Sequence, residues 1–125
     1  MTRRVTRMTM IFFLLTGLTA GCGPESATHT PAGDIARGER AIEIAGCGSC
    51  HAIPGIDSAN GRVGPPLHNL ARRAYLAGVL PNNFTNLVRW IQHPRDISPG
   101  TAMPDTGLDQ RTAEDIAAYL YHMEP

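Results

Sequence analysis

The chain has 125 residues, which is enough for one domain once an N-terminal targeting segment is removed. Eleven arginines balance eleven acidic residues, and there is no lysine, so the formal net charge is zero. Residues 22–125 keep eight of the arginines and all eleven acidic residues, a balance of −3, and this acidity argues against nucleic acid as a partner.

The N-terminus predicts export. Three arginines within the first seven residues precede an apolar run over residues 8–18, which is long enough for the hydrophobic region of a signal peptide and short for a membrane span. The run ends in Leu-Thr-Ala-Gly before Cys22, which resembles the lipobox of bacterial lipoproteins. We therefore expect residues 1–21 to be a lipoprotein signal peptide and Cys22 to be the lipidated N-terminus. The alternatives are a retained anchor helix and an ordinary cleaved signal.

Lipidation would hold the protein on the periplasmic side of the inner membrane or on the outer face of the cell membrane. Residues 22–33 have the composition of a flexible tether, and the domain is expected to occupy residues 34–125. Asp34 is a candidate N-cap for the first helix. Gly38 inside this helix predicts a close crossing by another helix.

Residues 47–51 are Cys-Gly-Ser-Cys-His. This is the attachment motif for c-type haem, in which Cys47 and Cys50 form thioethers and His51 becomes the proximal iron ligand. A zinc site would need further ligands, and no cysteine follows Cys50. A thioredoxin-like dithiol would follow a strand, and no segment with the period of a strand precedes Cys47. A disulfide within the motif would close a loop too short to stabilise the fold much. One covalent haem c with its iron is the expected cofactor.

Two further helices are expected after the motif. One covers residues 84–93 and is stopped by Pro94. The last begins near Thr112, which has capping-box spacing to Asp115, and carries an apolar stripe of Ile116, Tyr119, Leu120 and Met123. The intervening segments are rich in Gly, Pro and Asn, so no sheet is expected. We predict an all-α fold in which three or more short helices surround one haem.

Two methionines remain after the predicted cleavage. Met123 continues the stripe of the last helix, which is typical of a core residue. Met103 lies between Pro99 and Pro104 in a segment that is neither helix nor central strand, so its sulfur is the expected sixth iron ligand. The rival ligands are the histidines outside the motif, His29, His68, His93 and His122.

From Asp34 to the C-terminus, the chain resembles the small monohaem class I cytochromes c, and in particular the cytochrome c domain fused to subunit II of some bacterial haem-copper oxidases. The resemblance rests on the haem motif, on Gly-Pro-Pro-Leu at residues 64–67, on residues 87–94, on the Met103 loop and on Ala-Tyr-Leu at residues 118–120. It implies the class I cytochrome c fold.

The resemblance also implies roles for single residues. The Pro65 carbonyl would accept a hydrogen bond from the His51 ring. Arg73 would lie near a haem propionate, Trp90 would lie against the haem on its Met side, and Thr101 would place a hydroxyl beside the propionates.

The same resemblance places Gly38 and Tyr119 at the crossing of the first and last helices. Ile42 is a departure, because the family commonly has an aromatic residue there.

Iron held by His51 and Met103 has no open position for a substrate. The expected function is therefore that of a membrane-anchored one-electron carrier, not an enzyme. It would link a respiratory complex, dehydrogenase or quinol-oxidising complex to a terminal oxidase or reductase. The alternatives are a haem peroxidase or small-ligand sensor with a displaceable sixth ligand, and a non-catalytic subunit of one complex. The lack of lysine favours a dedicated redox partner over a generic basic docking face.

Overall fold

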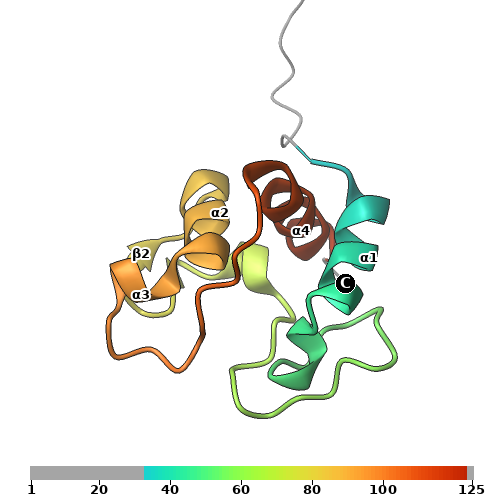
Figure 1. Cartoon of the computed structure of the whole chain (residues 1–125), viewed down its shortest axis with the longest axis horizontal. Coiled ribbons are helices and arrows are strands. Elements are labelled where there is room, and N and C mark those ends of the chain that lie inside the picture. The colour runs from blue at the N-terminus through green and yellow to red at the C-terminus, as the bar shows by residue number, and fades with distance from the viewer. Residues whose placement is uncertain (1–32, 124–125) are drawn as a thin grey trace, which may run out of the picture.

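Helices make up most of the regular structure (Figure 1). The computed structural model describes residues 33–123, so Cys22, the predicted signal peptide and all of the predicted tether except Gly33 lie outside the described residues. The elements, with η for a 3₁₀-helix, are α1 (Ile35–Ile44), η1 (Cys47–Ser49), η2 (Leu70–Arg72), β1 (Tyr75–Leu76), β2 (Leu80–Pro81), α2 (Phe84–Gln92), α3 (Pro94–Ile97) and α4 (Gln110–His122). None of these helices is long and apolar enough to cross a membrane.

The first and last helices cross at Gly38. A Cβ atom on Gly38 would overlap the backbone carbonyl of Asp115 and would lie 2.9 Å from the Cβ of Tyr119. Only glycine lets the two backbones approach so closely. Ile42, one turn further along α1, is 1 % exposed, so an aliphatic side chain fills this part of the core. The predicted crossing of α1 and α4 at Gly38 and Tyr119 is confirmed.

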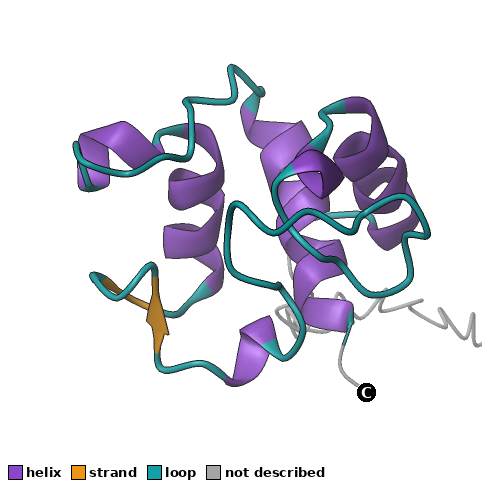
Figure 2. Cartoon of the chain, turned by 90° about the horizontal axis from the view of Figure 1, so that it is seen from below, coloured by secondary structure: helices purple, strands orange, loops and turns teal. Residues whose placement is uncertain are grey.

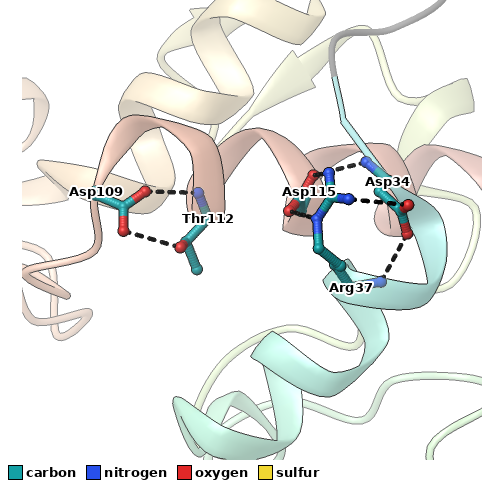
Figure 3. Close-up of polar contacts among 5 residues, drawn as sticks. All are labelled: Asp34, Arg37, Asp109, Thr112 and Asp115. Atoms are coloured by element: carbon teal, nitrogen blue, oxygen red, sulfur yellow. Dashed lines mark hydrogen bonds and ion pairs between the residues drawn. The ribbon is translucent and has the colours of Figure 1, made fainter.

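A buried carboxylate ties the start of α1 to α4 (Figure 3). Asp34 caps α1, as predicted, by accepting a hydrogen bond from the backbone N–H of Arg37 at 2.9 Å. Asp115, which is 4 % exposed, accepts the backbone N–H of Asp34 at 2.6 Å and the Nε of Arg37 at 2.7 Å. The hydrogen bond from Arg37 lowers the pKa of Asp115 below its ordinary value, so the carboxylate stays ionised at neutral pH.

Helix α4 begins earlier than predicted. Its N-cap is Asp109, whose carboxylate accepts the backbone N–H of Thr112 at 2.8 Å and the Thr112 hydroxyl at 3.0 Å (Figure 3). Thr112 is therefore inside the first turn, and the predicted capping box with Asp115 is wrong. Because Asp115 pairs with α1, it is not free to cap its own helix.

The predicted helix over residues 84–93 is confirmed as α2, which Asn83 caps by accepting the N–H of Asn86 at 2.9 Å. Pro94 ends it by starting α3, where a missing N–H costs nothing. The expectation of no sheet is wrong, because β1 and β2 form a small antiparallel hairpin. Strands of two residues are too short to show an alternating pattern in the sequence.

The apolar core lies where α4 meets α1 and α2. Its buried aliphatic side chains include Ile42, Leu87, Ile91, Ile116 and Leu120. Figure 1 shows α4 between α1 on one side and α2 on the other. The residues that line the candidate site come from both sides of α4, and Ile116 and Leu120 of α4 line it as well.

Candidate cofactor site

A cavity of about 690 Å³ lies beneath α4. This volume is within the range of small-molecule and cofactor pockets. The residues that line one side of the cavity lie on α1, η1 and the loop that follows, and those that line the other side lie on the hairpin, α2 and the loop over residues 98–108. Figures 1 and 2 show these elements on the two sides of α4. All eight residues predicted to bind a cofactor line it: Cys47, Cys50, His51, Pro65, Arg73, Trp90, Thr101 and Met103. Their chemical roles stay predictions.

The single turn of η1 places the haem-motif residues on the cavity wall. Gly46 precedes it in the left-handed conformation, with φ of 69°, which lets the chain leave α1 sharply. The backbone N–H groups of Cys50 and His51 both bond to the carbonyl of Cys47, at 3.2 and 3.0 Å. The Ser49 hydroxyl closes the turn on the Gly46 carbonyl at 2.7 Å. The turn brings both thiols and the imidazole to one cavity.

The ring of His51 is held on two sides. Its Nδ1 lies 2.7 Å from the carbonyl oxygen of Pro65. A carbonyl only accepts, so Nδ1 carries the proton and Nε2 keeps the lone pair that can bind a metal. A Cβ atom on Gly64 would overlap ring atom Cε1 of His51 and would lie 2.7 Å from Nδ1. This close approach explains why glycine precedes the two prolines.

The loop over residues 98–108 brings Met103 to the opposite wall. The backbone N–H of Met103 donates to the hydroxyl oxygen of Thr101 at 3.2 Å. The loop is fastened to α2, because Thr106 donates its hydroxyl proton to the Ile91 carbonyl at 2.9 Å and Gln92 Nε2 donates to the Leu108 carbonyl at 3.0 Å. Neither Thr106 nor Gln92 belongs to a recognisable motif, and their roles follow only from these contacts between the loop and α2.

The rival iron ligands lie elsewhere. Met123 is partly buried and packs against the apolar core, and it is not among the residues that line the cavity. His68, His93 and His122 are exposed and are also absent from the cavity wall. His29 lies outside the described residues. Of the methionines and histidines weighed as a sixth ligand, Met103 alone among residues 33–123 reaches the cavity.

Arg73, directly after η2, and Trp90, on α2, both line the cavity. Trp90 is half-buried. Nη2 of Arg73 donates to two backbone carbonyls, that of Pro66 at 2.5 Å and that of His68 at 2.9 Å. These contacts do not involve a propionate, and the resemblance did not imply them.

The Cys47 thiol does not have the environment of the reactive thiol in a redox dithiol. Burial raises the pKa of the Cys47 thiol above its ordinary value, and the neighbouring Cys50 raises it further. Dithiol oxidoreductases depend on the opposite shift, which produces a thiolate. Within the described part of the chain, no three His, Cys, Asp or Glu side chains gather as metal ligands, so Cys47 and Cys50 have no partners for a tetrahedral zinc site.

The residues present fit a covalent haem. The cavity is lined mainly by apolar side chains, offers a nitrogen donor from one wall and a thioether from the other, and has two cysteines at its edge. Imidazole and thioether are the pair of donors that c-type electron carriers use.

Comparisons with known proteins agree with this chemistry. A sequence model of the cytochrome c family, described as "Cytochrome c", matches residues 35–124. Cytochrome c oxidase subunit 2 of Alkalihalophilus pseudofirmus is 34 % identical over 85 residues, and the match covers 67 % of this chain and 24 % of that protein. The same subunit of Bacillus subtilis is 33 % identical over 95 residues, covering 74 % of this chain and 27 % of that protein. The chain thus matches about a quarter of the length of these relatives.

Among solved structures, cytochrome c2 of Rhodobacter sphaeroides is similar, with a TM-score of 0.51 and 21 % identity. The match covers 72 % of this chain and 95 % of that structure. This likeness shows the fold, and it confirms the predicted class I cytochrome c architecture.

Proposed function

The chain belongs to the cytochrome c family, whose members carry covalently bound haem c with iron, and on this premise we propose that it is a one-electron carrier with iron ligated by His51 and Met103. The observation that carries the proposal is that one cavity collects both motif cysteines, His51 and Met103 from distant parts of the chain. If His51 and Met103 both held the iron, it would have no position left for a substrate.

Each of these residues has a distinct task. The bound haem supplies a reversible one-electron couple, in which thioether ligation favours the ferrous state. Cys47 and Cys50 would hold the haem in place through covalent thioether bonds. His51 presents Nε2, because the Pro65 carbonyl holds its Nδ1 proton at 2.7 Å. The Met103 loop, fastened to α2, closes the other side.

The mouth of the cavity indicates how a partner would dock. Val63 and Tyr75 line the cavity and are also 75 % and 60 % exposed, so its rim carries apolar surface. The chain has no lysine. Both features favour a dedicated redox partner that is recognised by shape and apolar contact. The similarity to subunit 2 of cytochrome c oxidases supports an oxidase as the acceptor, with a respiratory complex or dehydrogenase as the donor.

We place the carrier outside the cytoplasm, with residues 1–21 as a lipoprotein signal peptide, residues 22–33 as a tether and residues 34–125 as the electron-transfer domain. Cys22 would carry the acyl chains that anchor it to the membrane surface. The support is the sequence of the N-terminus, where an apolar run ends at this cysteine.

The test uses the full chain matured with haem, and it compares wild type with Met103→Ala and Met123→Ala. Wild type should show haem that stays with the protein in denaturing electrophoresis, a ferric sulfur-to-iron charge-transfer band and no binding of carbon monoxide when reduced. Met103→Ala should lose the band, bind carbon monoxide and have a lower reduction potential. Met123→Ala, the matched control, should keep the band and lose only stability.

Two results would refute the ligand assignment. One is a reduced wild-type protein that binds carbon monoxide readily, which would favour a ligand sensor or peroxidase. The other is loss of the charge-transfer band only in Met123→Ala.

A further inference from the structure

Two consecutive prolines lie in the backbone that holds the ring of His51. Pro65 and Pro66 have no N–H group, so neither residue can donate a backbone hydrogen bond that would fix this part of the segment. Gly64 and Leu67, on either side, donate to the carbonyls of Cys50 at 2.8 Å and Ala52 at 2.9 Å. These two bonds fix the ends of the segment. The orientation of the two proline carbonyls depends on the groups that bond to them.

Arg73 is the residue that holds the second proline carbonyl. Its Nη2 donates one proton to the Pro66 carbonyl and the other to the His68 carbonyl, at 2.5 and 2.9 Å. One planar nitrogen thus clamps two carbonyls of the chain directly after Pro65, the residue that accepts the His51 proton. A lysine ammonium would keep the charge, but it would not reproduce this planar geometry.

Arg73 is in turn held from α4. Asn82 Nδ2 donates to the backbone carbonyl of Arg73 at 2.8 Å and to that of Leu70 at 2.7 Å. Asn82 Oδ1 accepts the hydroxyl proton of Tyr121 at 2.6 Å. A chain of hydrogen bonds therefore runs from Tyr121 on α4 through Asn82 and Arg73 to the Pro66 carbonyl. Nothing in the local sequence pattern links these residues.

We propose that Arg73 is a positioning residue for His51, which sets the strength of the Nδ1–H bond to Pro65 by clamping the Pro66 and His68 carbonyls, with Asn82 and Tyr121 holding Arg73 in place. This proposal rests on the proposed function, in which His51 is an iron ligand. A strong Nδ1–H bond makes the imidazole a more basic ligand, which favours ferric iron. Loosening the clamp should raise the reduction potential.

The direction in which the reduction potential changes distinguishes a positioning role of Arg73 from the effect of its charge. Arg73 also carries a positive charge on the cavity wall, and removing a positive charge near the iron favours the ferric state and lowers the potential. Arg73→Lys keeps the charge and loses the clamp. Arg62→Gln removes one charge from an exposed position beside Val63 on the cavity rim and leaves the clamp intact.

The experiment measures two quantities in the full haem-loaded chain: the midpoint potential and the solvent exchange rate of the His51 Nδ1 proton, followed by NMR in the reduced protein. Arg73→Lys should raise the potential and speed the exchange about threefold to tenfold, the change expected when one hydrogen bond is lost. Tyr121→Phe, which changes no charge, should shift both in the same direction by less. Arg62→Gln should lower the potential and leave the exchange rate unchanged.

The proposal would be overturned if Arg73→Lys and Tyr121→Phe both had the same potential and exchange rate as the wild type. Arg73 would then act through its charge alone. If Arg73→Lys does not accumulate with haem, Tyr121→Phe decides the question. The Tyr121 hydroxyl bonds to Asn82 and Tyr121 does not line the cavity, so this variant can act on His51 only through the hydrogen bonds that hold Arg73. A failure of the proposed function is distinguishable. It would appear as carbon monoxide binding in the wild-type protein, whatever the variants do.

Discussion

Gly64→Ala is the substitution that tests the fit around His51 most directly. The added Cβ would overlap ring atom Cε1 and would lie 2.7 Å from Nδ1, whereas ordinary contact begins at 3.4 Å, so the Cβ must separate from Nδ1 by about 0.7 Å and from Cε1 by more. If the ring moves away from the backbone, the Nδ1 to Pro65 distance of 2.7 Å lengthens toward 3.4 Å, beyond the range of a good hydrogen bond. Overpacking of this kind costs about 1–3 kcal/mol. The weakened hydrogen bond adds about 1 kcal/mol.

Thermal unfolding of the haem-loaded protein and its reduction potential are the assays. For a domain of this size, a loss of about 2 kcal/mol lowers the melting temperature by roughly 10 °C. We also expect a changed potential, because the iron ligand has moved. The haem should remain covalently attached, since Cys47 and Cys50 are untouched.

Gly100→Ala, in the loop over residues 98–108 that carries Met103, is the matched control. No heavy atom lies within 4 Å of the Cβ that it would add. It should therefore leave both measurements near the wild-type values. If Gly64→Ala behaves like Gly100→Ala in both assays, the reasoning from the contact between Gly64 and His51 is wrong.

Two other predictions concern the anchor and the helix crossing. Cys22→Ala should leave a haem-containing domain that no longer partitions with membranes, and mass spectrometry of the wild type that finds an unmodified N-terminus at another residue would contradict the lipoprotein assignment. Asp115→Asn should lower the free energy of unfolding at pH 7 by about 1.5 kcal/mol, the value at the low end for a hydrogen bond to a charged group. We take the low end because Arg37, the partner of Asp115, is partly exposed to solvent. The folded pKa of Asp115 is lowered, so its contribution is complete above the unfolded value of about 4 and is lost as pH falls through the folded pKa. Denaturant unfolding at a series of pH values should therefore show the gap between wild type and Asp115→Asn closing in acid, and a gap that stays constant would argue against the ion pair.

Much of the candidate site could be predicted because its signals are local. The haem motif occupies five consecutive residues, and Met103 is marked by the prolines on either side of it in one short segment. The N-cap at Asp34 and the end of α2 before Pro94 depend on hydrogen bonds within one turn. Such features are determined by neighbours in the sequence, so they do not depend on how the rest of the chain packs.

The partners of single polar side chains could not be predicted in the same way. Asp115 has the spacing of a capping residue, yet its carboxylate accepts the backbone N–H of Asp34, which is 81 positions away. Tyr121 looks like an ordinary residue of the last helix, and it bonds to Asn82 across 39 positions. A periodic pattern states which face of a helix is buried, but it does not state which distant group that face meets.

The sequence by itself therefore determined the proposed chemistry of this protein: which side chains are available to bind haem and iron, and where along the chain they lie. Only the tertiary structure decided how those groups are held. The contact of Gly64 with His51 and the clamp of Arg73 on Pro66 exist because separate segments are packed around one cavity. Covalent attachment and metal ligation depend on residue types and short spacings, which the sequence contains. The orientation of the side chains depends on distances that exist only when α1, α2 and α4 are packed around the site.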